Sequence, residues 1–101
     1  MKSITSKELA ELIKIGTDIQ LIDVRETNEH EAFNIGGTNI PLQEITKSIM
    51  QIEKDIPVVI YCRVGIRSQI AIQRLQEKYC FYNLTNLIGG TEAWRKQFPV
   101  E

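Results

Sequence analysis

The chain has 101 residues, a formal net charge of −1, 43% hydrophobic residues and 25% charged residues. These values are ordinary for a globular protein with one core, so we expect a single domain over residues 1–101. The near-neutral charge argues against nucleic acid or a membrane surface as a partner. The sequence contains neither an apolar run of transmembrane length nor an apolar signal core at its N-terminus, which predicts a cytoplasmic protein.

The first helix is expected directly after Thr5. Thr5 and Glu8 have the spacing of a capping box, and Gly16 is placed to end the helix. A short strand is expected before it, over residues 2–4. Residues 19–24 then form a nearly continuous apolar run, which is typical of a strand buried on both faces of a parallel sheet.

Two charged residues, Asp23 and Arg25, come at the carboxyl end of this strand. Ligands bind at that edge in parallel α/β sheets. We interpret Asp23 and Arg25 as an ion pair that supports a site at this edge without touching the substrate. His30 is the only histidine and stands between Glu29 and Glu31, so we expect it to face solvent and to be a weak catalytic candidate.

The rest of the chain alternates between helix and strand. Helical turns are expected over residues 28–33, a strand over 38–40, a helix over 42–52, a strand over 58–61, a helix over 68–79, a strand over 83–87 and a helix over 91–98. Such alternation predicts a parallel sheet covered on both faces. The expected fold class is α/β, with a five-stranded, mainly parallel sheet and helices on both faces.

The loop after the strand at 58–61 carries the candidate chemistry. It begins at Cys62 and continues with Arg63, Val64, Gly65, Ile66, Arg67 and Ser68. Free backbone amides in the loop and first helical turn, together with two arginines, favour a cysteine thiolate and can hold an oxyanion. These residues predict a nucleophilic Cys62 in an anion-binding cradle, which Gly65 allows to curl. The alternative is a buried structural cysteine beside two solvated arginines.

The second cysteine, Cys80, is not expected to pair with Cys62, because the intervening helix holds the two too far apart for a disulfide. With Tyr79, Phe81 and Tyr82 as neighbours, Cys80 is expected to fill the core. The sequence has no phosphate-loop lysine motif, no dinucleotide fingerprint and no metal-spaced Cys/His set.

Four motifs, in this order, resemble those of single-domain rhodanese-like sulfurtransferases. They are Leu-Ile-Asp-Val-Arg-Glu at 21–26, Asn-Ile-Pro-Leu at 39–42, Tyr-Cys-Arg-Val-Gly-Ile-Arg-Ser at 61–68, and Leu-Ile-Gly-Gly at 87–90 followed by Ala93 and Trp94. The resemblance covers nearly the whole chain. It implies that Cys62 takes a sulfane sulfur from a small anionic donor such as thiosulfate, or from a persulfide, and passes it to a thiol, cyanide or protein acceptor. It implies no metal or organic cofactor.

One segment departs from the family pattern. Phe33 and Asn34 stand where the family often has glycine and histidine, which puts in doubt any contact between loops that this histidine would make.

Two rival functions also stay open. Phosphatases and arsenate reductases on this fold have five residues between cysteine and arginine and usually a histidine before the cysteine, whereas four residues separate Cys62 from Arg67 and Tyr61 precedes Cys62. Non-catalytic or regulatory rhodanese-like binding modules typically lack the cysteine.

Overall fold

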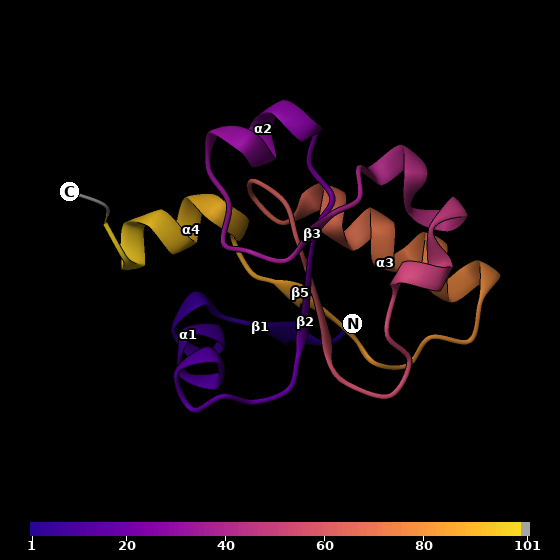
Figure 1. The fold of residues 1–101 in the computed structure, drawn as a ribbon, viewed down its shortest axis with the longest axis horizontal. Coiled ribbons are helices and arrows are strands. Elements are labelled where there is room, and N and C mark those ends of the chain that lie inside the picture. Colours follow the sequence, from indigo (N-terminus) through magenta and orange to yellow (C-terminus); the bar gives the residue numbers. More distant parts are fainter. Residues whose placement is uncertain (100–101) are drawn as a thin grey trace.

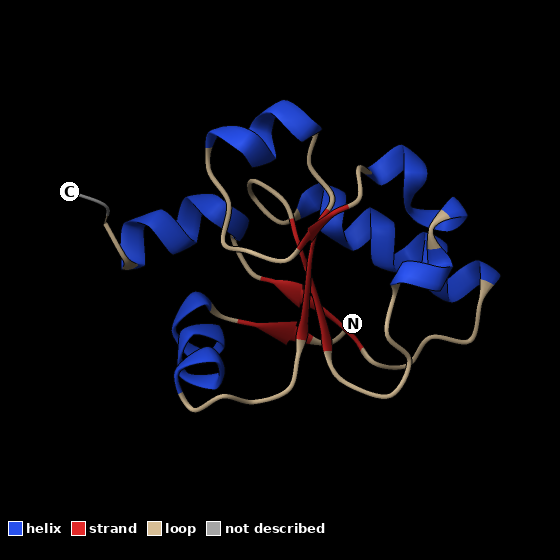
Figure 2. Cartoon of the chain, viewed as in Figure 1, coloured by secondary structure: helices blue, strands red, loops and turns tan. Residues whose placement is uncertain are grey.

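The computed structural model describes residues 1–99, whose five strands form one parallel sheet (Figures 1 and 2). The strands are β1 Ser3–Ile4, β2 Gln20–Asp23, β3 Thr38–Asn39, β4 Val58–Tyr61 and β5 Leu84–Leu87. They lie in the order β1-β5-β4-β2-β3, and every pairing is parallel. The α/β fold class expected from the sequence is therefore confirmed, with β4 at the centre of the sheet.

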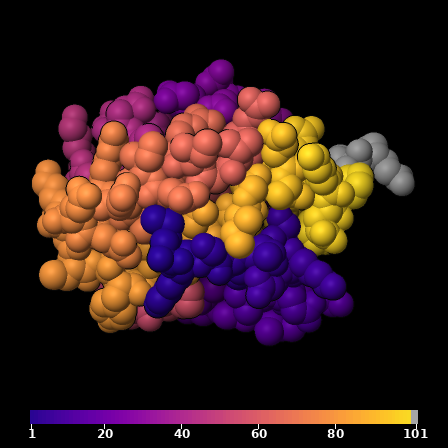
Figure 3. Space-filling view, turned by 180° about the vertical axis from the view of Figure 1, so that it is seen from behind, coloured from indigo at the N-terminus to yellow at the C-terminus, as the bar shows by residue number. Residues whose placement is uncertain are grey.

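Helices cover both faces of this sheet (Figure 1). They are α1 Ser6–Lys14, α2 Thr27–Ala32, α3 Ile66–Lys78 and α4 Gly90–Gln97, with two 3₁₀ helices, η1 Leu42–Lys47 and η2 Ile49–Gln51. One face is covered by α3 and η1, and the other by α1 and α4. Seen from behind, the N-terminal segment lies against the C-terminal half of the chain, as the pairing of β1 with β5 requires (Figure 3). Within residues 1–99, no helix is both long and apolar enough to span a membrane.

The alternation of side chains along β4 divides the core into two clusters. Val58 and Ile60 belong to the cluster beneath α3, whereas Val59 and Tyr61 belong to the cluster beneath α1 and α4. Successive side chains of a strand point to opposite faces. The residue after Tyr61 is Cys62, so this alternation directs the thiol toward α3, in whose cluster it lies.

Most elements lie close to the expected bounds. The capping box forms as predicted, because Thr5 Oγ1 accepts from the Glu8 amide over 3.1 Å and a Glu8 carboxylate oxygen accepts from the Thr5 amide over 2.9 Å. The prediction of one continuous helix over residues 42–52 is wrong. Two 3₁₀ helices occupy this segment and meet at Ser48, and short polar side chains such as those of Thr46 and Ser48 compete with helical backbone bonds.

Candidate active site

Cys62 directly follows β4, and only 1% of its surface is exposed. Its sulfur accepts hydrogen bonds from the Gly65 amide over 3.1 Å and from the Ser68 amide over 3.4 Å. Gly65 precedes α3 with φ +99°, a backbone conformation that favours glycine. The loop therefore points amides at the sulfur, while the side chains of Val64 and Ile66 face outward.

These contacts affect the ionisation of Cys62. Burial acts to raise the pKa of the thiol. Contacts of the sulfur with the hydroxyl and the amide of Ser68, and with the amides of Gly65 and Val64, outweigh burial and hold the pKa of Cys62 below its ordinary value. Since the thiolate is the nucleophilic form of cysteine, the cradle favours a reactive Cys62.

The start of α4 holds the other side of the loop. The Thr91 amide donates to the Cys62 carbonyl over 2.9 Å, and the Glu92 amide donates to the Arg63 carbonyl over 3.0 Å. Gly90 lets α4 approach this closely, because a Cβ at this position would stand 2.1 Å from the Cys62 carbonyl oxygen. The Gly-Gly turn predicted after β5 therefore lies at the same edge of the sheet as Cys62, as expected.

Sequence reasoning did not find Asn86, which is part of the site. Asn86 lies on β5 and is paired in register with Ile60 of β4, so its side chain faces the same side of the sheet as Cys62. Its Oδ1 accepts a hydrogen bond from the buried Ser68 hydroxyl, which lies 3.5 Å from the Cys62 sulfur. The available signal was weak, because β5 has the sequence Leu-Thr-Asn-Leu and nothing in this pattern distinguishes Asn86 from Thr85.

The two arginines of the loop are both paired with carboxylates. The two terminal nitrogens of Arg67 donate to the two carboxylate oxygens of Glu29 on α2, over 2.8 and 3.0 Å. This hydrogen bonding is the main cause that lowers the pKa of Glu29 to about 2. Arg63 is exposed and lies 3.2 Å from a Glu92 carboxylate oxygen. The sequence predicted Arg67 as a cation free to hold a substrate anion, and its pairing with Glu29 was missed.

The predicted ion pair of Asp23 and Arg25 forms and is buried. Both the backbone amide and the guanidinium of Arg25 donate to the Asp23 carboxylate, and the guanidinium also donates to the Phe33 carbonyl.

The prediction that His30 faces solvent is wrong. Its side chain is only 20% exposed, and its Nδ1 lies 2.9 Å from the Asp23 carboxylate, because α2 turns residue 30 toward the sheet. Among residues 1–99, His, Cys, Asp and Glu side chains form no group of three that could hold a metal ion.

The segment that departs from the family pattern is held by local contacts and by the sheet. Asn34 donates from its side-chain amide to the His30 carbonyl and accepts from the Gly36 amide, each over 2.9 Å. From β4, the Tyr61 hydroxyl donates to the Gly36 carbonyl over 2.9 Å and accepts from the Ile35 amide over 3.2 Å. These contacts place α2 and the Cys62 loop at the same end of the sheet (Figure 1).

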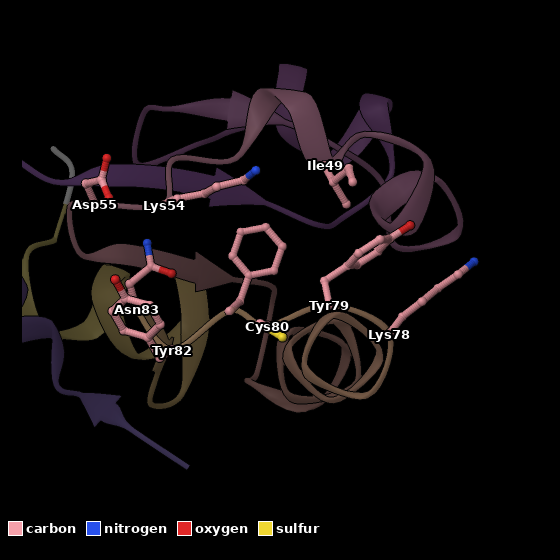
Figure 4. A pocket seen from close by; sticks show the side chains of 9 residues that line it. Ile49, Lys54, Asp55, Lys78, Tyr79, Cys80, Tyr82 and Asn83 are labelled. Atoms are coloured by element: carbon pink, nitrogen blue, oxygen red, sulfur yellow. The ribbon is translucent and has the colours of Figure 1, made fainter.

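The prediction that Cys80 fills the core is wrong, because Cys80 is exposed. The chain leaves α3 in an extended conformation at Tyr79, so Tyr79 and Phe81 turn inward and Cys80 turns outward. Cys80 lines a pocket of about 570 Å³ at the amino-terminal edge of β4 and β5, opposite the Cys62 edge (Figure 4). Both cysteines are free, in agreement with the expected absence of a disulfide between them.

Comparison with known proteins reveals clear relatives. The chain is 39% identical over 95 residues to YqhL, an uncharacterized protein of Bacillus subtilis, in a match that covers 93% of this chain and 72% of that protein. It is 33% identical over 100 residues to thiosulfate sulfurtransferase GlpE of Coxiella burnetii, with 98% of this chain and 92% of that protein covered.

Solved structures share the whole fold. The human single-domain sulfurtransferase TSTD1 matches with a TM-score of 0.79 and 26% identity over 96% of this chain and 97% of its own. A Rhodopseudomonas palustris protein of unknown function, described as a possible tyrosine phosphatase, matches with a TM-score of 0.83 and 25% identity over 100% of this chain and 85% of its own. Residues 5–97 match the Rhodanese-like domain family, and the chain therefore belongs to that family.

Proposed function

We propose that this protein is a sulfurtransferase that carries a sulfane sulfur on Cys62 as a persulfide. The observation that supports this most is the pair of amide hydrogen bonds from Gly65 and Ser68 to a buried sulfur whose pKa is lowered. Amides so placed favour the thiolate before the reaction and the persulfide anion after it. The similarity to a thiosulfate sulfurtransferase over almost the full length of both chains also supports this function.

The reaction takes place in two displacements. The Cys62 thiolate attacks the outer sulfur of thiosulfate, a new S–S bond forms, the S–S bond of the donor breaks, and sulfite leaves with the electron pair. A thiolate or cyanide then attacks the outer sulfur of the persulfide, and Cys62 leaves as the thiolate. Each step breaks one S–S bond and forms one new bond to the transferred sulfur, S–S with a thiolate and S–C with cyanide, so no external oxidant, metal or organic cofactor is needed.

Each group around Cys62 has a proposed role in this reaction. The amides of residues 63–68 bind the donor anion, Arg67 adds an attraction that its pairing with Glu29 weakens, and Arg63 contributes from the rim. Asp23 and Arg25 do not touch the donor. They support the site because their ion pair fixes the Phe33 carbonyl at the end of α2.

Mass spectrometry of the intact protein tests this proposal. Incubation with thiosulfate should add the mass of one sulfur atom, and cyanide or a small thiol should remove it. Cys62→Ser should not gain this mass, because a serine hydroxyl is not ionised at neutral pH. Cys80→Ser is the matched control and should still gain it, since Cys80 lies at the opposite edge of the sheet. Loading of Cys62→Ser, or failure of Cys80→Ser to load, would refute a Cys62 carrier.

Phosphate-ester hydrolysis is the second candidate, and similarity to the Rhodopseudomonas palustris protein favours it. The Cys62 loop argues against it, since four residues between Cys62 and Arg67 form a smaller ring than a tetrahedral phosphate needs. Hydrolysis of an aryl phosphate by the wild type, without loading by any sulfur donor, would establish the phosphatase. A Cys62 that neither loads nor reacts with thiol labels at neutral pH would indicate a binding module.

A further inference from the structure

We propose that Glu29 determines which sulfur donors this site accepts, and that it favours donors with a single negative charge over dianions such as thiosulfate. Organic persulfides and thiosulfonates belong to the favoured class. This inference rests on the proposed sulfurtransferase function, and it concerns a residue that the Cys62 loop itself does not contain.

The first step is that Glu29 occupies the guanidinium that would bind the donor. Both carboxylate oxygens of Glu29 engage both terminal nitrogens of Arg67, which is the geometry that a bound oxyanion would use. Glu29 is also fixed from behind, because one of its oxygens accepts from the Glu26 amide over 3.0 Å. The pair is half-buried, with side-chain exposures of 33% for Arg67 and 28% for Glu29.

The second step is that Arg67 lies close to the reacting sulfur, because it directly precedes Ser68, whose amide donates to the Cys62 sulfur over 3.4 Å. Hydrogen bonding to Glu29 is the main cause that raises the pKa of Arg67, and the charge of Cys62 also contributes. An anionic donor bound beside the Cys62 sulfur is therefore attracted by the Arg67 guanidinium and repelled by the Glu29 carboxylate. Because these two charges cancel, Arg67 offers little net attraction to a donor.

The third step is that no other arginine near Cys62 makes up for this cancellation. Arg63 is exposed and pairs with Glu92, and Arg25 is buried and pairs with Asp23. With the Cys62 thiolate added, the charges around the sulfur sum to a negative value. A dianionic donor is repelled about twice as strongly by Glu29 and the thiolate as a monoanionic donor is, since Coulomb energy is proportional to donor charge.

Thiosulfate and methanethiosulfonate are the matched probes. Each gives its outer sulfur to Cys62 as the donor S–S bond breaks, and sulfite or methanesulfinate leaves with the electron pair, but the donors carry two charges and one. In Glu29→Gln, the KM for thiosulfate should fall about tenfold and that for methanethiosulfonate about threefold, because removing one charge acts on two donor charges or on one. The kcat values should change little.

Two further variants separate charge from structure. Glu31→Gln removes the same charge from the exposed side of α2 and should change either KM less than twofold. Glu29→Asp keeps the charge and should retain the donor preference of the wild type. Unchanged KM values in a folded Glu29→Gln, or equal changes for both donors, would overturn the proposal.

The wild type supplies an independent test that does not depend on the folding of any variant. Added salt should lower the KM for thiosulfate, because it screens a repulsion, whereas a site with a free Arg67 would show a rise. A rise would therefore refute the role of Glu29. If neither donor loads Cys62, the sulfurtransferase function itself fails. If both donors load and the preference is independent of Glu29, only the present inference fails.

Discussion

Gly90→Ala should destabilise the protein strongly, because it separates α4 from the Cys62 loop. The new Cβ would stand 2.1 Å from the Cys62 carbonyl oxygen and 2.6 Å from that of Arg63, both backbone atoms that cannot rotate away. Relief requires α4 to shift, which breaks the hydrogen bonds from the Thr91 and Glu92 amides. Each bond contributes about 0.5–1.5 kcal/mol, and a non-glycine residue at φ +55° adds about 1–2 kcal/mol of strain. We expect a loss of about 3 kcal/mol in the free energy of unfolding.

Gly16→Ala is the matched control for Gly90→Ala. Gly16 has φ +76°, but a Cβ there would meet no atom within 4 Å. This variant should therefore lose only the strain energy, about 1–2 kcal/mol. Urea unfolding followed by circular dichroism measures both losses. If Gly90→Ala is no more destabilising than Gly16→Ala, then α4 does not anchor the loop and the structural reasoning is refuted.

Two other predictions concern ionisation. Ser68→Ala should raise the pKa of Cys62, because it removes the hydroxyl that lies 3.5 Å from the sulfur and helps to lower this pKa; the pH dependence of alkylation measures the change, and an unchanged pKa would mean that the amides alone stabilise the thiolate. Glu29 has its pKa lowered from 4.5 to about 2, so it stabilises the fold above the higher value, and this contribution is lost as pH falls through that window. Glu29→Gln should flatten the pH dependence of unfolding between these values, and a curve as steep as that of Glu31→Gln would contradict the assignment.

The elements that the sequence predicted well are those with local causes. The capping box of Thr5 and Glu8, the apolar strand before Cys62 and the Gly89–Gly90 turn each depend on residues adjacent in the chain, and each is present. The segment over residues 42–52 was misjudged because apolar residues three and four apart occur in both α and 3₁₀ helices. Only Ile45 of this segment is fully buried in the first 3₁₀ helix, and short polar side chains such as Thr46 and Ser48 disfavour a continuous α-helix.

The parts of the site that were missed depend on contacts between distant segments. Local spacing indicated that amides of the loop would surround the Cys62 sulfur, but it contained no information about which carboxylate would meet Arg67. That partner, Glu29, lies 38 residues earlier, and Asn86 reaches Ser68 from 18 residues later. If Arg67 were unpaired, the loop would carry a positive charge that attracts dianions. With Glu29 bound to Arg67, the charges of these two side chains cancel. The loop sequence is therefore enough to propose Cys62 as the nucleophile, whereas the donor charge that we propose the site prefers depends on α2, which carries Glu29.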